Sequence, residues 1–110
     1  MISEQEFRLE ADRALERLQH SLLPLADEQG FEVELQNGVL QVVFDDDAQG
    51  KFVVSPNAPV RQIWVSAHSK SYKLDWDKGE GTFVLPETGQ SLQILMEEAI
   101  GRQLGQEVSL

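Results

Sequence analysis

Hydrophobic spacing changes twice along this chain, from a helical period to a strand period and back to a helical period. Near the start of the chain, apolar residues recur every three or four positions between Phe7 and Leu22. Between Phe31 and Leu85, apolar and polar residues alternate in short runs separated by turn residues. From Leu92 to Ile100 the helical spacing returns. The pattern predicts a helix, about six short strands and a second helix.

Local signals mark the ends of both predicted helices. Ser3 and Glu6 have the spacing of a capping box, so the first helix is predicted to begin there. Pro24 is predicted to end that helix near residues 22–23, because proline disrupts a helix interior. Gly105 is predicted to close the second helix.

The strands are bounded by turn residues. Asn37 and Gly38 form the dipeptide preferred in two-residue hairpins, because both central positions of that turn need a positive φ. The segment from Pro56 to Pro59 is expected to interrupt the strand pattern, and His68 is expected to be an exposed turn residue without chemistry. The predicted strands are 31–36, 39–44, 51–55, 60–67, 71–77 and 82–85.

Short connections and two amphipathic helices together predict the fold. Strands joined by short turns pair with their neighbours, which gives an antiparallel meander. Each helix has one apolar stripe that must cover a sheet. We therefore predict an α+β fold: a two-layer sandwich in which both terminal helices pack on one face of the sheet and the other face is open to water. At 110 residues the chain is predicted to be a single domain, residues 1–110.

The fourth predicted strand places a tryptophan on the open face. Ile63, Val65 and Ala67 share one face, whereas Gln62 and Trp64 lie on the other. Large exposed aromatic rings are over-represented where partners bind. The alternative is that Trp64 packs under a loop or against a neighbouring strand, and the pattern leaves both interpretations open.

The formal net charge of −10 is concentrated in the first half of the chain. Residues 1–50 carry twelve acidic and three basic side chains, whereas residues 51–110 carry seven and six. The resulting negative electrostatic potential repels nucleic acid and anionic membranes, and it attracts metal cations and basic protein surfaces. Plain solubility explains the same charge, and composition by itself favours that explanation.

Several classes of protein are excluded or disfavoured. The chain has no cysteine, so it cannot form disulfides or thiolate metal sites. No apolar run approaches the roughly 20 residues that span a bilayer, and the acidic start lacks the features of a signal peptide. A cytoplasmic, bacterial-type protein is therefore expected.

No catalytic residues are predicted. There is no glycine-rich phosphate loop, no Ser/His/Asp arrangement at a recognisable spacing, and no Glu-x-x-His motif of the kind found in di-iron bundles. The chain is therefore not expected to be an enzyme.

Carboxylates suggest a site for cations. Asp12, Glu16 and His20 are spaced by four and form a line opposite the apolar stripe of the first helix. Carboxylates suit hard cations, and imidazole suits ferrous iron. The alternative is a solvated helix face, in which nearby arginines neutralise some of these acids. The further candidate ligands are Asp27, Glu28, Glu32, Glu34 and Asp45.

The ordered set of features resembles the frataxin family, and its bacterial members in particular. The resemblance extends from Phe7 to Leu104. It implies the same α–β sandwich, weak binding of ferrous or ferric iron by acids of the first helix and first strand, and docking on a cysteine desulfurase and an iron–sulfur scaffold protein. The motifs that carry it are the Asn37–Gly38 turn, Pro59, Gln62–Ile63–Trp64, Tyr72, Asp75–Trp76 and Thr88–Gly89.

The resemblance also implies residue roles. It implies a regulator of iron–sulfur cluster assembly, for which weak iron oxidation would be a side activity. The protein is expected to be monomeric, and oligomerisation under iron load is left open. Residues 23–26 and His20 stand where relatives often carry acids, so the acidic ridge is thinner here. The alternative is a metal-independent acidic adaptor. The implied partner-binding residues are Asn57, Gln62, Trp64, Lys73 and Phe83.

Overall fold

The order of elements matches the periodicity of the sequence. The structure is a computed structural model that describes residues 2–44 and 50–110. Within these residues it forms α1 (Glu4–Gln29), β1 (Glu32–Gln36), β2 (Val39–Val43), β3 (Lys51–Asn57), the short 3-10 helix η1 (Ala58–Val60), β4 (Gln62–Ala67), β5 (Lys70–Asp77), β6 (Thr82–Val84) and α2 (Leu92–Leu104).

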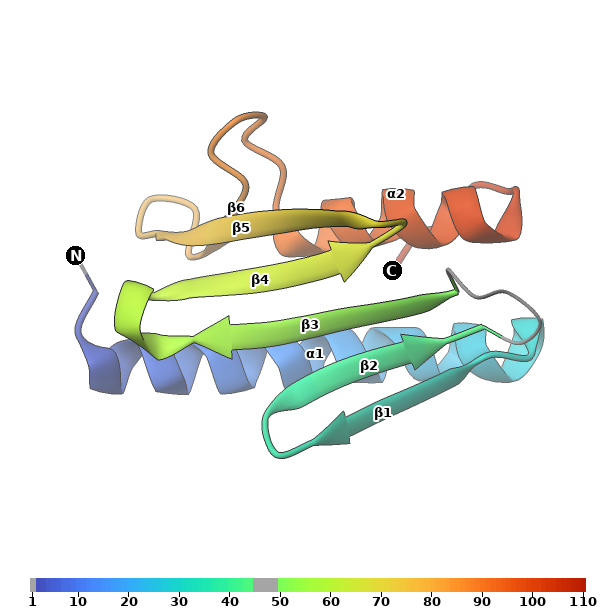
Figure 1. Cartoon of the computed structure of the whole chain (residues 1–110), viewed down its shortest axis with the longest axis horizontal. Coiled ribbons are helices and arrows are strands. Elements are labelled where there is room, and N and C mark those ends of the chain that lie inside the picture. Colours follow the sequence, from blue (N-terminus) through green and yellow to red (C-terminus); the bar gives the residue numbers. More distant parts are fainter. Residues whose placement is uncertain (1, 45–49) are drawn as a thin grey trace.

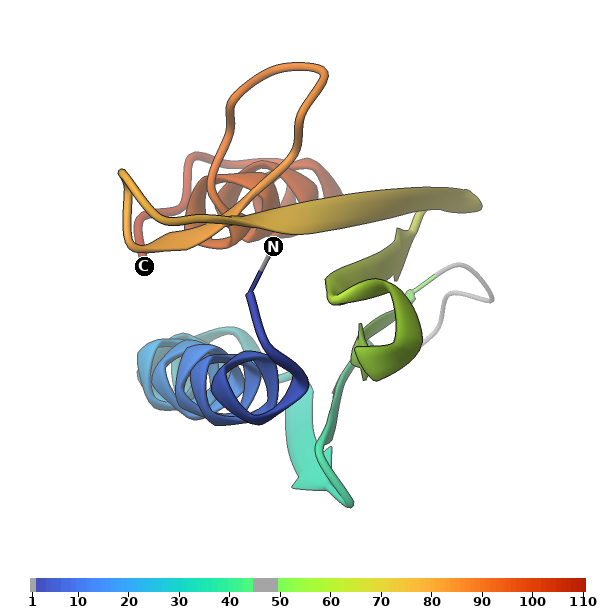
Figure 2. The ribbon, with the colours of Figure 1, turned by 90° about the vertical axis from the view of Figure 1, so that its left-hand side faces the viewer.

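The described strands form one antiparallel sheet in the order β1-β2-β3-β4-β5-β6, as the short connections predicted (Figure 1). Both helices lie on the same side of this sheet (Figure 2). α1 packs against β1, β2 and β3, and α2 packs against β6. The predicted two-layer α+β sandwich is confirmed, and neither of the described α-helices lies on the other face of the sheet.

The core lies between the helices and the sheet. α1 buries a stripe that includes Phe7, Leu15 and Leu22, and α2 buries Leu95 and Ile100. Every strand except β1 contributes at least one fully buried apolar side chain from its helix-facing side. Because strand side chains alternate, their sequence neighbours are presented on the open face.

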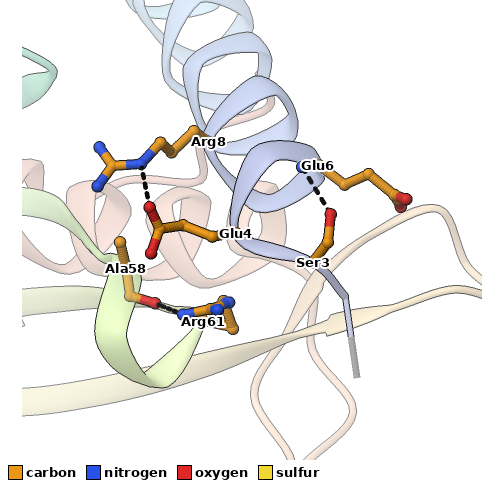
Figure 3. A network of polar contacts seen from close by, with 6 residues as sticks. All are labelled: Ser3, Glu4, Glu6, Arg8, Ala58 and Arg61. Carbon is orange, nitrogen blue, oxygen red and sulfur yellow. Dashed lines mark hydrogen bonds and ion pairs between the residues drawn. The ribbon is translucent and has the colours of Figure 1, made fainter.

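The start of α1 is fixed by the predicted cap. The side chain of Ser3 accepts a hydrogen bond of 3.1 Å from the backbone N–H of Glu6, whereas the carboxylate of Glu6 points away from Ser3 (Figure 3). Arg8 pairs with Glu4 at 3.3 Å one turn further on. The serine half of the predicted capping box therefore forms.

The end of α1 differs from the prediction. The helix continues through Pro24 to Gln29 and is closed by Gly30, whose φ is 78°. Pro24 is exposed, so water can reach the carbonyl of His20, which proline leaves without an intrahelical partner. Beyond the proline, Ala26 is buried and continues the apolar stripe. Packing of the last turn therefore outweighs the local preference of proline.

The break between the third and fourth strands is also shifted. β3 continues through Pro56, which lies opposite Ile63, so the strand pattern is not interrupted there. The interruption is η1 instead, and it leaves Val60 outside β4. Arg61 follows with a φ of 55°, and its guanidinium donates a hydrogen bond to the carbonyl of Ala58 (Figure 3).

Candidate functional site

The open face of the sheet presents Trp64 near its centre. Its neighbours Ile63 and Val65 are buried on the helix side, whereas Trp64 is 36% exposed. Ser55 on β3 and Lys73 on β5 lie directly opposite it on either side. The alternation inferred from the sequence is thus confirmed, and Trp64 belongs to the uncovered face.

The Trp64 ring is held by its neighbours. Its indole Nε1–H donates to Oε1 of Gln62 over 2.9 Å, and Nε2 of Gln62 donates to Oδ1 of Asp75 over 3.0 Å. The ammonium of Lys73 lies 4.9 Å from the ring centroid, within the range of a cation–π contact. These contacts orient a large apolar ring at the surface before any partner arrives.

Asp75 was missed as a functional candidate. It is half-buried on β5, directly opposite Gln62, and its carboxylate fixes which way the Gln62 amide points. This role can be recognised only from the register of the β4–β5 hairpin, which sets Asp75 opposite Gln62. That register depends on a two-residue turn at His68 and Ser69, which lacks the Asn-Gly signature that marked the first hairpin.

The predicted partner residues do not all reach the open face. Asn57 lies there opposite Gln62, and Lys73 is exposed. Phe83 as a partner contact is wrong: it is 0% exposed, because alternation along β6 turns it toward the helices. Its ring centroid lies 5.7 Å from that of Phe7 and 5.1 Å from that of Trp76. Phe83 is therefore a core residue.

The acids of α1 are exposed along its outer side. Asp12 and Glu16 line a shallow hollow with Leu35 and Gly38. Glu16 also borders a second hollow that includes His20. In the described part of the chain, two arginines of α1 form ion pairs with other acids, Arg8 with Glu4 and Arg13 with Glu10, both at 3.3 Å. The carboxylates of Asp12 and Glu16 are left out of both pairs.

The remaining predicted ligands are dispersed. Glu32 and Glu34 are exposed on the open face of β1, and Asp27 and Glu28 are exposed in the last turn of α1. Asp45 lies outside the described residues. Within the described ranges, no three His, Asp or Glu side chains form a group that could hold a metal ion. The acids therefore make a charged surface rather than a preformed cage.

His68 differs from expectation. It is half-buried, its ring centroid lies 5.0 Å from that of Phe52, and Nε2 lies 3.0 Å from Oε1 of Gln103 on α2. It therefore connects the β4–β5 turn to the end of α2.

Among the described residues, no helix is both long and apolar enough to cross a membrane.

A family model described as "Frataxin-like domain" matches residues 1–106. The "Iron-sulfur cluster assembly protein CyaY" of Ectopseudomonas mendocina is 32% identical over 92 residues, which cover 82% of each chain. The protein of the same name from Azotobacter vinelandii is 29% identical over 96 residues, which cover 86% of each chain. The similarity to these proteins is therefore not limited to the short motifs, and it covers most of the chain.

Solved structures agree on the fold. Frataxin from Psychromonas ingrahamii superposes with a TM-score of 0.79 at 20% identity, covering 98% of this chain and 97% of that one. Trimeric yeast frataxin, solved in complex with ferrous iron, gives a TM-score of 0.74 at 27% identity, with coverage of 88% and 87%.

Proposed function

Because this chain belongs to the frataxin family, we propose that it is an iron-binding regulator of iron–sulfur cluster assembly that docks on a cysteine desulfurase and its scaffold protein. The CyaY proteins similar to it are named for iron–sulfur cluster assembly, which supports the process. A yeast relative crystallised with ferrous iron supports the choice of metal.

The observation that carries the docking part is the orientation of Trp64 on the uncovered face. Aromatic residues dominate the binding energy of many interfaces. A ring already held by Gln62 and Lys73 loses little side-chain entropy when a partner covers it. We assign the scaffold contact to this face, with Asn57 at its border.

The iron part rests on exposed carboxylates. Asp12 and Glu16 share one hollow and take no part in the arginine ion pairs of α1 within the described residues, so we propose them as the first ligands. Such carboxylates keep most of their hydration, so binding should be weak and poorly selective. The further proposed ligands are His20, Asp27, Glu28, Glu32, Glu34 and Asp45.

We propose no catalytic residues for this chain. Iron oxidation would follow from iron held at exposed carboxylates and would not be a designed activity. The chain would act by changing how fast its partners make clusters.

A metal-independent adaptor is the second candidate. The observation that favours it is the dispersal of the acids, since no three of them form a metal group within residues 2–44 and 50–110. In this case the carboxylates would steer a basic partner and keep the protein soluble, and iron would have no specific effect.

An anaerobic NMR titration separates the two candidates. Ferrous iron is added to the 15N-labelled protein, with magnesium as the control cation. If amides at Asp12, Glu16 and Glu32 broaden with iron well before they respond to magnesium, the iron role holds. If both cations act alike and weakly, the adaptor function replaces it.

A reconstituted assembly reaction tests the regulatory role. A bacterial cysteine desulfurase and scaffold protein are supplied with iron and cysteine, and the rate of cluster formation is followed with increasing amounts of this protein. The proposal expects a concentration-dependent change in rate. A rate that stays constant up to excess protein would contradict it.

A further inference from the structure

One edge of the sheet has no partner strand among the residues that the structure describes. Among the described strands, β1 pairs only with β2, and it forms the lower border of the sheet in Figure 1. The opposite border differs, because β6 has only three residues and its Val84 is bridged to Ser91. β1 is therefore the longer and more accessible edge.

The backbone of β1 offers unpaired hydrogen-bonding groups. In a two-residue hairpin, the residues flanking the turn exchange both backbone hydrogen bonds, and these are Gln36 and Val39. Alternation along the ladder then turns the N–H and C=O groups of Val33 and Leu35 away from β2. No hydrogen bond from another described element reaches these groups. They form a template for one added strand.

Carboxylates flank this edge on both sides. Glu32 and Glu34 lie on the open face of β1, opposite Val43 and Gln41. On the helix side, Asp12 and Glu16 border the hollow that contains the Leu35 side chain. A strand added to β1 would therefore place alternate side chains near two different pairs of acids, one pair on each face.

We propose that the free edge of β1 binds an extended, basic segment of a partner protein by strand addition. The segment would pair with the backbone of Val33 and Leu35. It would carry Lys or Arg at successive positions, so that one face meets Glu32 and Glu34 and the other meets Asp12 and Glu16.

A second copy of this chain is a poor occupant. Antiparallel pairing of two β1 strands would bring Glu32 and Glu34 of each copy close to those of the other, and like charges on paired strands are destabilising. The same carboxylates that prevent edge-to-edge association of identical chains therefore favour a basic segment. The choice of a protein partner rests on the proposed docking function.

Backbone pairing can be separated from simple charge attraction. The probe is a synthetic peptide of alternating Lys and Arg with Thr at its ends. The control is the same peptide N-methylated at every residue, which keeps its charge but removes the N–H groups along both of its edges. With the unmodified peptide, we expect the Val33 and Leu35 amides to exchange at least tenfold more slowly.

The result with the control peptide decides the mode of binding. The N-methylated peptide should bind several-fold more weakly and leave the Val33 and Leu35 amides unprotected. If the methylated peptide binds as tightly as the unmodified one, or if the unmodified peptide protects neither amide, strand addition is overturned and the acids act by charge alone.

A protein variant provides an independent test. Val33→Pro removes the outward N–H of Val33 without removing a β1–β2 hydrogen bond, and proline is tolerated on strand edges. Val33→Ala is the matched control for loss of the side chain. The proposal expects Val33→Pro to weaken peptide binding several-fold relative to Val33→Ala, once both variants show an intact hairpin by NMR. Equal binding would overturn it.

The proposed function has its own readout. If strand addition fails while the wild-type protein still changes the rate of cluster assembly, only the mode of partner binding is wrong. If the peptide pairs with β1 but the wild-type protein does not change the rate of cluster assembly, strand addition at β1 stands and the proposed function fails.

Discussion

The indole N–H of Trp64 donates a hydrogen bond of 2.9 Å to the side-chain oxygen of Gln62, two residues earlier on the same face of β4. Gln62 in turn donates to the carboxylate of Asp75 across the β4–β5 ladder. The orientation of the most exposed aromatic ring on the open face therefore depends on a carboxylate of the neighbouring strand.

Replacing Gln62 by methionine should loosen this ring. Methionine keeps the length of the side chain but can neither accept from Trp64 nor donate to Asp75. We expect the free energy of unfolding to fall by about 1 kcal/mol and scaffold affinity to fall several-fold, measured by chemical denaturation and calorimetry. Gln36→Met, on the same face of β1, is the control. Equal affinity losses in the two variants would contradict the positioning role.

The two tryptophans should behave differently when replaced by alanine. Trp64 is partly exposed, whereas Trp76 packs on Phe83 with ring centroids 5.1 Å apart. Trp76→Ala should cost about 3 kcal/mol of stability, but Trp64→Ala should cost much less and should abolish the effect on cluster assembly. Thermal unfolding and the assembly assay measure both. A large stability loss in Trp64→Ala would mean that its ring is structural.

Reversing the charges of Glu32 and Glu34 to lysine should weaken binding to the desulfurase, and more strongly at low salt because screening is weaker there. Surface plasmon resonance at several salt concentrations provides the measurement. The control reverses Glu80 and Glu87, two exposed acids in loops, so that net charge is matched. If both double variants lose the same affinity, only net charge matters and the edge has no special role.

Pro24→Ala should stabilise the protein. Pro24 is exposed inside α1, and alanine restores an amide that can bond the carbonyl of His20. Proline inside a helix is less favourable than alanine by about 3 kcal/mol, so we expect a gain of up to about that size in urea unfolding. Exposed Leu23→Ala serves as the control and should change stability little. A loss of stability in Pro24→Ala would show that proline has a packing role.

Gly101→Ala should detach the C-terminal tail from α2. A Cβ at Gly101 would lie 2.8 Å from the carbonyl oxygen of Gln106, too close for any real contact. The tail should shift, so the hydrogen bond of 2.7 Å from the Leu110 N–H to Glu97 should be lost. Faster amide exchange at Leu110 measures this. Glu98→Ala, at an exposed position of α2, should leave that amide protected. Unchanged exchange in Gly101→Ala would show that the tail adapts.

Much of the architecture was readable from local sequence because local rules and packing agree. Asn37 and Gly38 have φ values of 55° and 76°, as the predicted hairpin turn requires. Gly105 closes α2 with a φ of 72°. The alternation around Trp64 correctly separated its open face from the core. In each case the residue type that favours the local conformation is also the one that the fold needs.

Two predictions were wrong, one drawn from a local rule and the other from the family resemblance. Pro24 did not end α1, because Ala26 beyond it is buried. Phe83 was assigned to the surface by family resemblance, but its register with Trp76 turns it into the core. The acidic candidates that the structure describes are exposed side chains, as expected, but the sequence could not show that β1 separates Glu32 and Glu34 from Asp12 and Glu16.

The sequence by itself determined the order of elements, the first hairpin turn and the faces of the strands, since each depends on residues a few positions apart. Tertiary structure decided the turn at His68 and Ser69, whose φ values of 50° and 64° are uncommon for residues other than glycine. The contacts of His68 with Phe52 and Gln103 hold that turn, and both partners are distant in sequence. That turn fixes the register that sets Asp75 opposite Gln62, so the arrangement around Trp64 could emerge only from the folded chain.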